Sequence, residues 1–457
     1  MNKKTLEDIQ LTNKRIFLRV DYNIPTTYIN NTHQIQDTYR IISTIPTIKY
    51  ILCRNPKLLV IGTHFGRPKG NFKKELSLNF LPPFLEQLLH LQVEFSQLSE
   101  LENTLMDEKL DKNITENKID NEGKSNNALE RNVNDDKESD NEDLYKTKSC
   151  SSRANNNRII LLENLRFYMS EENEGENLEE YRKYFTKNFD ITVVDAFGVL
   201  HRKVNSIQTP TRVCGLLLKK ELEMLEYLKN FDLLIIGGSK VTDKVVFLKN
   251  IMKKCKKVYV VGKMCYVFIK VLSNNIINTN TSSEEEKDIL SAKEVLQVAD
   301  KFSVKVYLPK DFLVKEKKCR DSECSSNCKE GIDNKKECIS YQYVERIEPE
   351  QQGVDIGMKS IDELCGLIRT SKSVFWNGPV GIYEEKKSSF GTERVVKEME
   401  KIKESGGVSI VGGGDTVCAV GMFGDKENFS YVSTGGGALL KCLEGSEMPG
   451  LNSIEDK

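Results

Sequence analysis

A glycine-rich stretch near the carboxyl end of the chain holds the residues best suited to chemistry. Val408 to Ala419 reads VSIVGGGDTVCA, an apolar run that enters three glycines and then Asp415 and Thr416. This order predicts a strand, a tight turn and a helix start. Free N–H groups at a helix start bind phosphate, and a carboxylate beside them suits Mg²⁺. The stretch therefore predicts a nucleotide-phosphate and Mg²⁺ site, although Asp415 as a simple N-cap remains an alternative.

Two common nucleotide-binding motifs are missing from this sequence. It contains no G-x-x-x-x-G-K-[ST], and the G-x-G that begins at Gly412 lacks the third glycine of the dinucleotide fingerprint. A nucleotide site at this position would therefore belong to a different fold family.

Basic residues follow three predicted strands in the first half of the chain. His64 and Arg67 come after the apolar run KLLVIGT, Arg166 ends RIILLENLR, and His201 and Arg202 follow DITVVDAFGVL. Ligands of α/β proteins bind at the carboxyl ends of such strands. Because guanidinium forks fit carboxylate and phosphate groups, these residues predict a convergent cationic site for a small, highly charged compound.

Three polar residues near the start of the chain could join this site. Asp21 and Asn23 end a predicted strand over 14–23, and Arg40 lies in the first turn of a predicted helix over 37–51. A cation at a helix start opposes the dipole, so an anion facing Arg40 is one explanation. The alternatives are turn formation by Asp21 and Asn23 and a solvated Arg40.

The second half offers lysines in place of arginines. Lys240 and Lys244 follow an apolar run and two glycines in GGSKVTDK, and a spacing of four predicts that they share one helix face. Lysine commonly binds phosphate as a point charge, although a solvated lysine face is the alternative. Glu384 follows the turn WNGPVGIY and could accept a hydrogen bond from a ribose hydroxyl.

These residues need a scaffold, and the sequence predicts one of repeated strands and helices. Short apolar runs alternate with helical patterns over both halves, which predicts two α/β domains with parallel sheets. A long helical pattern over 211–228 is a candidate connector between them, and a second triple glycine after Tyr431 predicts another helix start.

Polar stretches interrupt this alternation at three places. Only 9 of the 47 residues in 111–157 are apolar, too few to offset chain entropy, so we expect a disordered insert. Residues 273–287 are predicted to form a loop, and 315–338 a mobile insert.

Bulk composition narrows the function classes. The 457 residues allow two or three domains, and the net charge of −1 argues against a large nucleic-acid footprint. The start MNKKTLEDIQ has no apolar signal segment, and no run approaches the length of a membrane span. We therefore expect a cytoplasmic protein with neither a nucleic-acid nor a membrane partner.

Taken together, the motifs resemble those of the phosphoglycerate kinase family. They occur in the family's order over nearly the whole chain: RVDYNIP (19–25), DTYRI (37–41), PTI (46–48), THFGRPKG (63–70), LLENLRFY (161–168), VDAFG with HR (194–202), KKEL (219–222), GGSKVTDK (237–244), VDIG (354–357), WNGPVGIYE (376–384), GTE (391–393), VGGGDT (411–416) and STGGGALLKCLEG (433–445).

The resemblance implies an enzyme that moves a phosphoryl group reversibly between 1,3-bisphosphoglycerate and ADP, giving 3-phosphoglycerate and ATP, with Mg²⁺. It implies two lobes joined by a hinge helix, each a three-layer, Rossmann-like α/β domain with a parallel sheet. The implied 3-phosphoglycerate-binding residues are Asp21, Asn23, Arg40, His64, Arg67, Arg166 and Arg202. The implied nucleotide-binding residues are Lys240, Lys244, Gly353, Asn377, Glu384, Gly413, Gly414, Asp415 and Thr416, with Asp415 also holding the metal. Arg40, Lys240, Gly414 and Gly436 would stabilise the transferring group.

The resemblance also implies an organisation of the chain. Residues 1–210 would form the substrate lobe, with an insert at about 102–157. Residues 211–439 would supply the hinge helix and the nucleotide lobe, with an insert at about 315–345. Residues 440–457 would return to the first lobe, and the protein would be a monomer.

Some positions depart from the family pattern. The adenine-side turn, usually G-G-x-M, reads Val261-Gly262-Lys263-Met264, and Tyr431 replaces a histidine. The turn is expected to affect nucleotide affinity or the choice between ATP and GTP. A catalytically silent relative that acts as a binding protein is the alternative, and the complete set of reactive Arg, Lys and Asp residues favours the enzyme.

Overall fold

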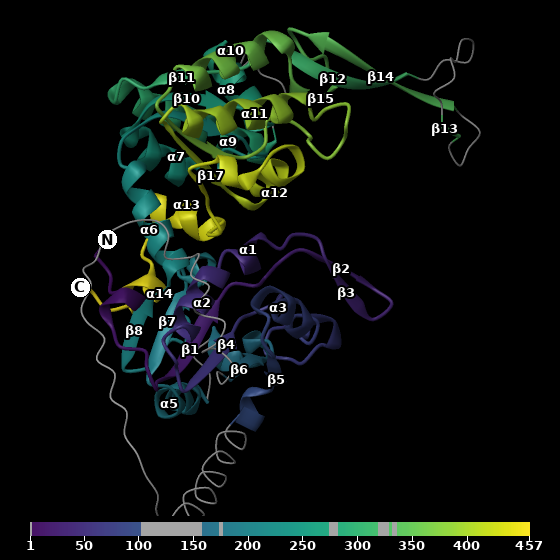
Figure 1. Cartoon of the computed structure of the whole chain (residues 1–457). Coiled ribbons are helices and arrows are strands. Elements are labelled where there is room, and N and C mark those ends of the chain that lie inside the picture. The colour runs from purple at the N-terminus through teal and green to yellow at the C-terminus, as the bar shows by residue number, and fades with distance from the viewer. Residues whose placement is uncertain (1, 102–157, 173–176, 274–281, 319–328, 331–335) are drawn as a thin grey trace, which may run out of the picture. The chain divides into compact units, whose positions relative to one another are not determined.

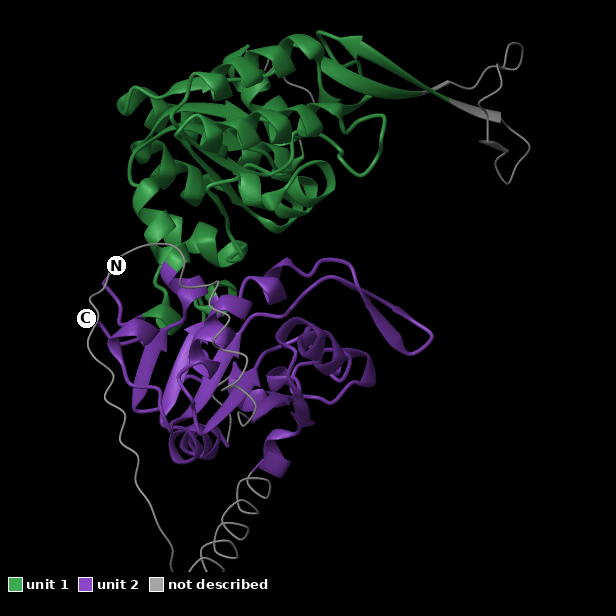
Figure 2. Ribbon diagram, in the orientation of Figure 1, with its two compact units in different colours: residues 1, 197–202, 220–451 green, residues 2–196, 203–219, 452–457 purple. Residues whose placement is uncertain are grey.

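The chain forms two compact units (Figure 2). The computed structural model describes residues 2–101, 158–172, 177–273, 282–318, 329–330 and 336–457. Unit 2 comprises 2–196, 203–219 and 452–457, whereas unit 1 contains 197–202 and 220–451. Helix α6 (Leu216–Tyr227) contributes residues to both. The expected insert at 102–157 lies outside the described residues.

Unit 2 is built on a six-stranded sheet (Figure 1) whose strands are all parallel, in the order β5-β6-β4-β1-β7-β8. The bounds are β1 Arg15–Val20, β4 Leu58–Gly62, β5 Glu94–Ser96, β6 Ile159–Leu162, β7 Ile191–Asp195 and β8 Thr211–Cys214. Arg19 of β1 pairs with Gly62 of β4, and Val20 pairs with Asp195 of β7. The strands therefore end together, and the loops that follow them emerge at one edge of the sheet.

Alternate residues of β1 explain the layers of unit 2. Ile16 and Leu18 pack into one core cluster with residues of α2 and α3, whereas Phe17 packs into another with Phe185 of α5. Because neighbouring side chains of a strand point to opposite faces, both faces of the sheet are covered. The helices are α1 Tyr39–Ile42, α2 Ile45–Leu52, α3 Pro82–Leu89 and α5 Leu178–Asn188.

Unit 1 repeats this plan with a second six-stranded parallel sheet, in the order β11-β10-β9-β16-β17-β18. The strands are β9 Phe231–Ile236, β10 Cys255–Val260, β11 Lys305–Tyr307, β16 Ser373–Asn377, β17 Val408–Gly412 and β18 Tyr431–Val432. Strand order runs outward in both directions from the β9–β16 pair. Right-handed connections then place the helices between strands on opposite faces of the sheet in the two directions.

Two groups of helices accompany this sheet. Helices α7 (Val245–Ile251), α8 (Met264–Leu272) and α9 (Ser283–Lys301) pack together, and so do α10 (Met358–Arg369), α11 (Phe390–Glu404) and α12 (Gly414–Phe423). The last two helices are α13 (Gly437–Leu443) and α14 (Pro449–Asn452). The prediction of two parallel-sheet α/β domains is confirmed. No helix among the described residues is long and apolar enough to cross a membrane.

Smaller elements complete the two units. An antiparallel sheet in the order β13-β14-β12-β15 comprises β12 Phe312–Lys318, β13 Lys329–Glu330, β14 Lys336–Val344 and β15 Gln352–Ile356. In unit 2, β2 (Thr26–Ile29) and β3 (Thr32–Ile35) form a hairpin. The 3₁₀ helices are Leu6–Asp8, Lys74–Leu76, Leu165–Phe167, Met169–Glu171, Phe197–Val199, Met252–Lys254 and Lys426–Asn428.

Several predicted elements differ from the structure. The helix over 37–51 is two helices, because the chain turns at Ser43 and Thr44 between α1 and α2. The helical pattern over 211–228 begins with strand β8, which pairs with β7. The loop predicted over 273–287 includes the start of α9, and the insert predicted over 315–338 contributes residues to β12 and β14.

Candidate active site

In unit 2, a buried carboxylate and two basic side chains meet after the ends of β1 and β4. The Arg40 Nη1 donates to the Asp21 Oδ2 at 2.8 Å, and the His64 Nε2 lies 3.8 Å from the Asp21 Oδ1. Asp21 and His64 are buried, whereas the Arg40 side chain is 28% exposed. A charged group entering from solvent would therefore reach Arg40 while Asp21 orients it.

Charges within this cluster fix its protonation states. Burial by itself would raise the pKa of Asp21, but the positive charges of Arg40 and Arg19 and a hydrogen bond from the Asn23 N–H hold that pKa below its usual value. Burial lowers the pKa of His64 well below 6.5. The positive charges of Arg19 and Arg166 lower this pKa further, whereas the negative charge of Asp21 opposes the shift. His64 is therefore neutral and Asp21 ionised at neutral pH, so the arginines supply the positive charge.

Further contacts place Arg166 beside the loop that follows β4 and contains His64 and Gly66. The Arg166 Nη1 donates to the Gly66 carbonyl oxygen at 2.8 Å, and the Asn23 Oδ1 accepts from the Gly66 N–H at 2.9 Å. The Arg166 Nε also donates to the Glu172 Oε1 at 2.8 Å. Asp21, Asn23, Arg40, His64 and Arg166 are thus brought together, as their positions after neighbouring strands predict.

Two of the predicted basic residues stand apart. Arg67 follows the same loop, is exposed, and makes no hydrogen bond or ion pair within the part of the chain that the structure describes. Arg202 is also exposed, donates through Nε to the His201 Nε2 at 3.0 Å, and clusters with unit 1. The structure therefore groups Arg67, but not Arg202, with the residues of unit 2.

Asn164 organises this cluster but was not predicted to have a role. Its side chain is fully buried, and its Oδ1 accepts from the N–H groups of Phe65 and Arg166, both at 3.1 Å. Its Nδ2 donates to the carbonyl oxygens of Phe65 and Leu76 at 2.7 and 3.0 Å. One amide therefore joins the loop after β4 to the loop after β6. The only sequence signal was a polar residue ending an apolar strand.

In unit 1, Lys244 points back to the ends of two strands. Its Nζ donates to the Gly237 carbonyl oxygen at 2.6 Å and to the Asn377 Oδ1 at 2.7 Å. Burial lowers the pKa of Lys244 to about 8, although the negative charges of Asp415 and Asp243 oppose the shift. Lys244 thus lies close to Asp415 as a partly desolvated cation, a setting that would favour an incoming phosphate.

Lys240 belongs to the same loop but faces another element. Its Nζ donates to the Glu284 Oε2 of α9 at 3.0 Å, and about half of the side chain is exposed. The prediction that Lys240 and Lys244 share a helix face is wrong, because both precede α7, which begins at Val245.

The triple glycine forms the predicted strand, turn and helix start. Gly413 has a φ of 96°, a conformation that favours glycine, and α12 begins at Gly414. The Thr416 Oγ1 accepts from the Gly378 N–H at 2.7 Å, and the Asn377 Nδ2 donates to the Gly412 carbonyl oxygen at 2.8 Å. These bonds join the ends of β16 and β17 and leave the start of α12 exposed at Gly414 and Asp415.

The residues present fit a Mg²⁺ ion that is shared with a phosphate ligand. Asp415 is an exposed carboxylate in the first turn of α12. Among the described residues, no three His, Cys, Asp or Glu side chains gather as a metal-binding group. Mg²⁺ is commonly held by one or two carboxylates with phosphate oxygens and water, so a single carboxylate beside a phosphate site suits it.

A cavity of about 260 Å³ adjoins this helix start within unit 1. Phe312, Val354 and Ile382 form an apolar part of its wall. Asp415 and Gly238 also line it. An apolar slot beside a phosphate site has the character of a pocket for a base and sugar.

The adenine-side residues of the prediction line this cavity in part. Gly353 and Lys263 both border it. A Cβ at Gly353 would lie 2.1 Å from the Tyr266 Oη, so only glycine leaves room for that hydroxyl. Glu384 is exposed, just beyond Tyr383.

Gly436 is anchored through a residue of α6 that received no predicted role. The buried Glu221 carboxylate accepts from the Ser433 hydroxyl at 2.8 Å and from the Thr434 N–H and hydroxyl at 2.7 and 2.8 Å. Gly436 has a φ of 50° and precedes α13. Glu221 therefore holds the segment that leads into the second glycine turn.

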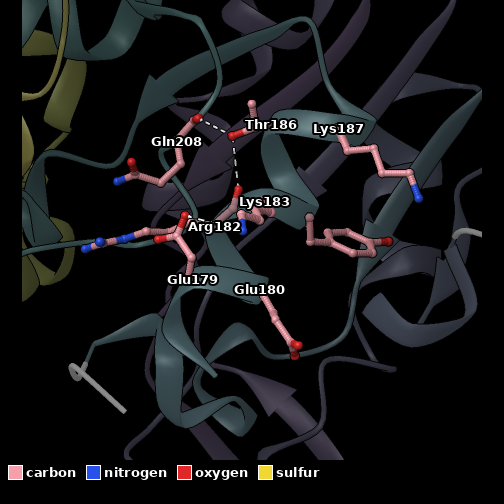
Figure 3. Close-up of a pocket in the computed structure, with 8 residues that line it drawn as sticks. Glu179, Glu180, Arg182, Lys183, Thr186, Lys187 and Gln208 are labelled. Carbon is pink, nitrogen blue, oxygen red and sulfur yellow. Dashed lines mark hydrogen bonds and ion pairs between the residues drawn. The ribbon is translucent and has the colours of Figure 1, made fainter. Parts of the chain in front are cut away.

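A larger concavity of about 810 Å³ lies over α5 of unit 2 (Figure 3). Its walls include Glu180, Arg182, Lys183 and Lys187. None of the candidate residues lines it, and its mixed charges favour no ligand class.

Comparison with known proteins gives one consistent result. A family model described as Phosphoglycerate kinase matches residues 6–121 and 128–446. The chain is 31% identical over its whole length to 99% of a phosphoglycerate kinase of Yarrowia lipolytica. It is 32% identical, with the same coverage, to a phosphoglycerate kinase of Neurospora crassa.

Solved structures agree with the sequence comparisons. The structure of a phosphoglycerate kinase from Coxiella burnetii matches with a TM-score of 0.69 and 26% identity, over 99% of this chain and 98% of that one. A Pyrococcus horikoshii structure of the same name, at 23% identity and a TM-score of 0.67 over 98% of each chain, shows the shared fold.

Proposed function

This chain belongs to the phosphoglycerate kinase family, and we propose that it transfers a phosphoryl group reversibly from 1,3-bisphosphoglycerate to ADP in a reaction that requires Mg²⁺. Family membership makes it a kinase of glycolysis, a phosphotransferase with a carboxyl group as acceptor. The observation that carries the proposal is the meeting of Arg40 and His64 at Asp21, with Arg166 bonded to the neighbouring Gly66.

We assign the glycerate substrate to the cluster of unit 2. Arg40, Arg67 and Arg166 would bind its carboxyl and phosphate groups, and Asp21 and Asn23 would accept hydrogen bonds from its hydroxyl. His64, held neutral by burial, would serve as a hydrogen-bonding partner rather than as a charge. Arg202 would complete this set from the end of its own loop.

We assign the nucleotide to unit 1. The cavity beside Gly353 would take the base and Glu384 the ribose, while Lys240, Lys244 and the start of α12 bind phosphates. Asn377 supports this arrangement, because it contacts both Lys244 and the backbone at Gly412. Asp415 and the phosphate oxygens would hold Mg²⁺, which supplies charge neutralisation for the transferring group.

The chemistry needs positioning more than covalent help. In the forward direction an oxygen of the β-phosphate of ADP attacks the phosphorus of the acyl phosphate. The bond to the carboxyl oxygen breaks, and a carboxylate leaves. The attacking oxygen is already ionised, so no general base is required. Arg40, Lys240 and the N–H groups near Gly414 and Gly436 would stabilise the transferring group.

The two ligands must be brought into line before transfer, so closure about α6 is the expected conformational step.

We propose 1–210 as the substrate lobe and 211–439 as the hinge and nucleotide lobe of a cytoplasmic monomer. Contacts within unit 2 support a returning carboxyl terminus, because Lys3 pairs with Asp456 and Lys4 with Glu455, both at 2.8 Å. Residues 440–451 cluster with unit 1.

The reverse reaction tests this proposal. Incubation with MgATP and 3-phosphoglycerate should yield an acyl phosphate, detected by a dehydrogenase that reduces it with NADH. Omission of 3-phosphoglycerate is the control. Binding of both ligands without any NADH oxidation would instead support the binding-protein alternative.

A further inference from the structure

Acidic residues at the start of a helix contact a loop of the proposed nucleotide site, and the reaction itself does not require them. The first turn of helix α9 contains Glu284, Glu285 and Glu286, and Asp288 follows one turn after Glu284. Glu285 pairs with Lys270 of the neighbouring α8 at 2.6 Å. Glu284 and Asp288, spaced four apart, instead reach toward the loop that carries Lys240 and Lys244.

These two carboxylates hold the loop at two points. The Glu284 Oε2 accepts from the Lys240 Nζ at 3.0 Å, and the Asp288 Oδ1 accepts from the Thr242 N–H at 2.8 Å. Ion pairing with Glu284 raises the pKa of Lys240, so the lysine stays charged throughout the neutral range. The two lysines of one loop thus point to different partners, Lys244 to the strand ends and Lys240 to α9.

Helix α9 is itself firmly placed. Ile289, Ala292, Val295 and Ala299 form its buried face, and α9 packs beside α7 and α8 (Figure 1). A helix fixed in this way presents the carboxylate of Glu284 at a defined place next to the phosphate loop. The negative charge there opposes the approach of phosphate and competes with it for the same ammonium group.

We propose that Glu284 is a positioning residue that holds Lys240 away from the nucleotide phosphates until they displace its carboxylate. The inference rests on the proposed function, since it takes a nucleoside diphosphate as the ligand of this loop. When phosphate binds, it would replace the Glu284 carboxylate as the partner of Lys240. Breaking the 3.0 Å contact would offset part of the free energy of binding. Glu284 would therefore raise the KM for ADP without changing the chemical step.

The pair is solvent-exposed, which limits the effect. The side chains of Lys240 and Glu284 are 48% and 74% exposed, and exposed pairs are weak and screened by salt. Glu284→Gln should tighten MgADP binding roughly two- to fivefold at low ionic strength, and the gain should shrink as salt is added. The KM for ADP should fall in parallel while kcat stays the same.

A matched control lies on the same helix. Glu294 pairs with Lys249 of α7 at 2.9 Å, so Glu294→Gln makes the same charge change and breaks a similar pair away from the phosphate loop. Calorimetric titration of the full chain with MgADP, and with adenosine as a ligand without phosphate, separates the effects. Glu294→Gln should leave both affinities unchanged, and Glu284→Gln should change only that for MgADP.

A double-mutant cycle gives the sharpest test. In a Lys240→Met background, Glu284→Gln should alter MgADP affinity less than half as much as in the wild type, because the competing pair is gone. An equal effect in that background would overturn the proposal, as would unchanged or weaker MgADP binding or equally tightened adenosine binding by Glu284→Gln. Absence of MgADP binding by the wild type would overturn the proposed function itself, and the inference with it.

Discussion

At the scale of the residue, Lys244 is a cation whose charge changes with pH near neutrality. It is a partly desolvated cation with a pKa of about 8, because burial outweighs its acidic neighbours. Lys240, whose pKa is raised by Glu284, does not titrate near that value. Any loss of positive charge from this loop between pH 7 and 9 is therefore due to Lys244.

This difference predicts how nucleotide affinity depends on pH. A lysine with a pKa of about 8 is charged below that pH and becomes neutral as the pH rises through it. The Kd for ADP should therefore rise above pH 8, by up to roughly tenfold per pH unit. Titration at several pH values measures it. Lys244→Arg keeps its charge over this range and should give a flat profile; the same rise in that variant would assign the effect to another group.

Arg40 carries the second prediction at this scale. Its guanidinium is the partly exposed cation paired with Asp21, and removing one donor aimed at a developing charge costs about 10²–10³ in turnover. Arg40→Ala should therefore lower kcat by about that factor and leave the Kd for ADP within about twofold. Arg54→Ala, whose guanidinium stacks on Tyr50, is the matched control and should be active. A comparable loss of ADP affinity would contradict the assignment of Arg40 to the glycerate.

Residues that carry charge or backbone freedom could be predicted from the sequence, whereas residues that act through buried hydrogen bonds could not. Arg40, His64 and Arg166 stood out as basic residues that could bind an anion. Asn164 donates hydrogen bonds to backbone groups that are distant in the sequence, and Glu221 accepts one from such a group. Their role depends on which loops meet in space, and a single sequence does not show that.

At the scale of the element, parallel strands were easier to predict than the connections between them. The run Leu58–Gly62 is apolar throughout because the strand is buried on both faces, and it forms β4 as expected. The segment before α7 was wrongly predicted as helix. A spacing of four residues is compatible both with a helix face and with a loop. Here the two lysines lie in a loop that is bound by two carboxylates of α9.

Asn164 makes a testable contribution at this scale, because it joins the loops after β4 and β6. Asn164→Ala would leave buried N–H and C=O groups without partners and should lower the free energy of unfolding by about 2–3 kcal/mol in a urea titration. It should also raise the KM for 3-phosphoglycerate, since His64 and Arg166 flank those loops. Asn71→Ala, at an exposed side chain with one bond to Lys69, is the control. Equal stability of the two variants would contradict this role.

At the scale of the whole molecule, the chain is a two-unit phosphotransferase interrupted by polar segments. The family match itself breaks between residues 121 and 128, within the region predicted as an insert. Because only 9 of the 47 residues in 111–157 are apolar, replacing them by a short Gly/Ser linker should leave turnover and the urea midpoint unchanged. Loss of folding or of activity in that variant would show that the segment is part of the working enzyme.

The most direct test of the account is ATP formation from 1,3-bisphosphoglycerate and ADP, measured with and without Mg²⁺ beside an Asp415→Ala variant. Asp415 is the exposed carboxylate at the start of α12, so its replacement should leave the fold intact and remove the proposed metal ligand. Turnover by the wild type should depend on Mg²⁺, and the variant should lose it. No turnover from well-folded wild-type protein, or full turnover by Asp415→Ala, would contradict it.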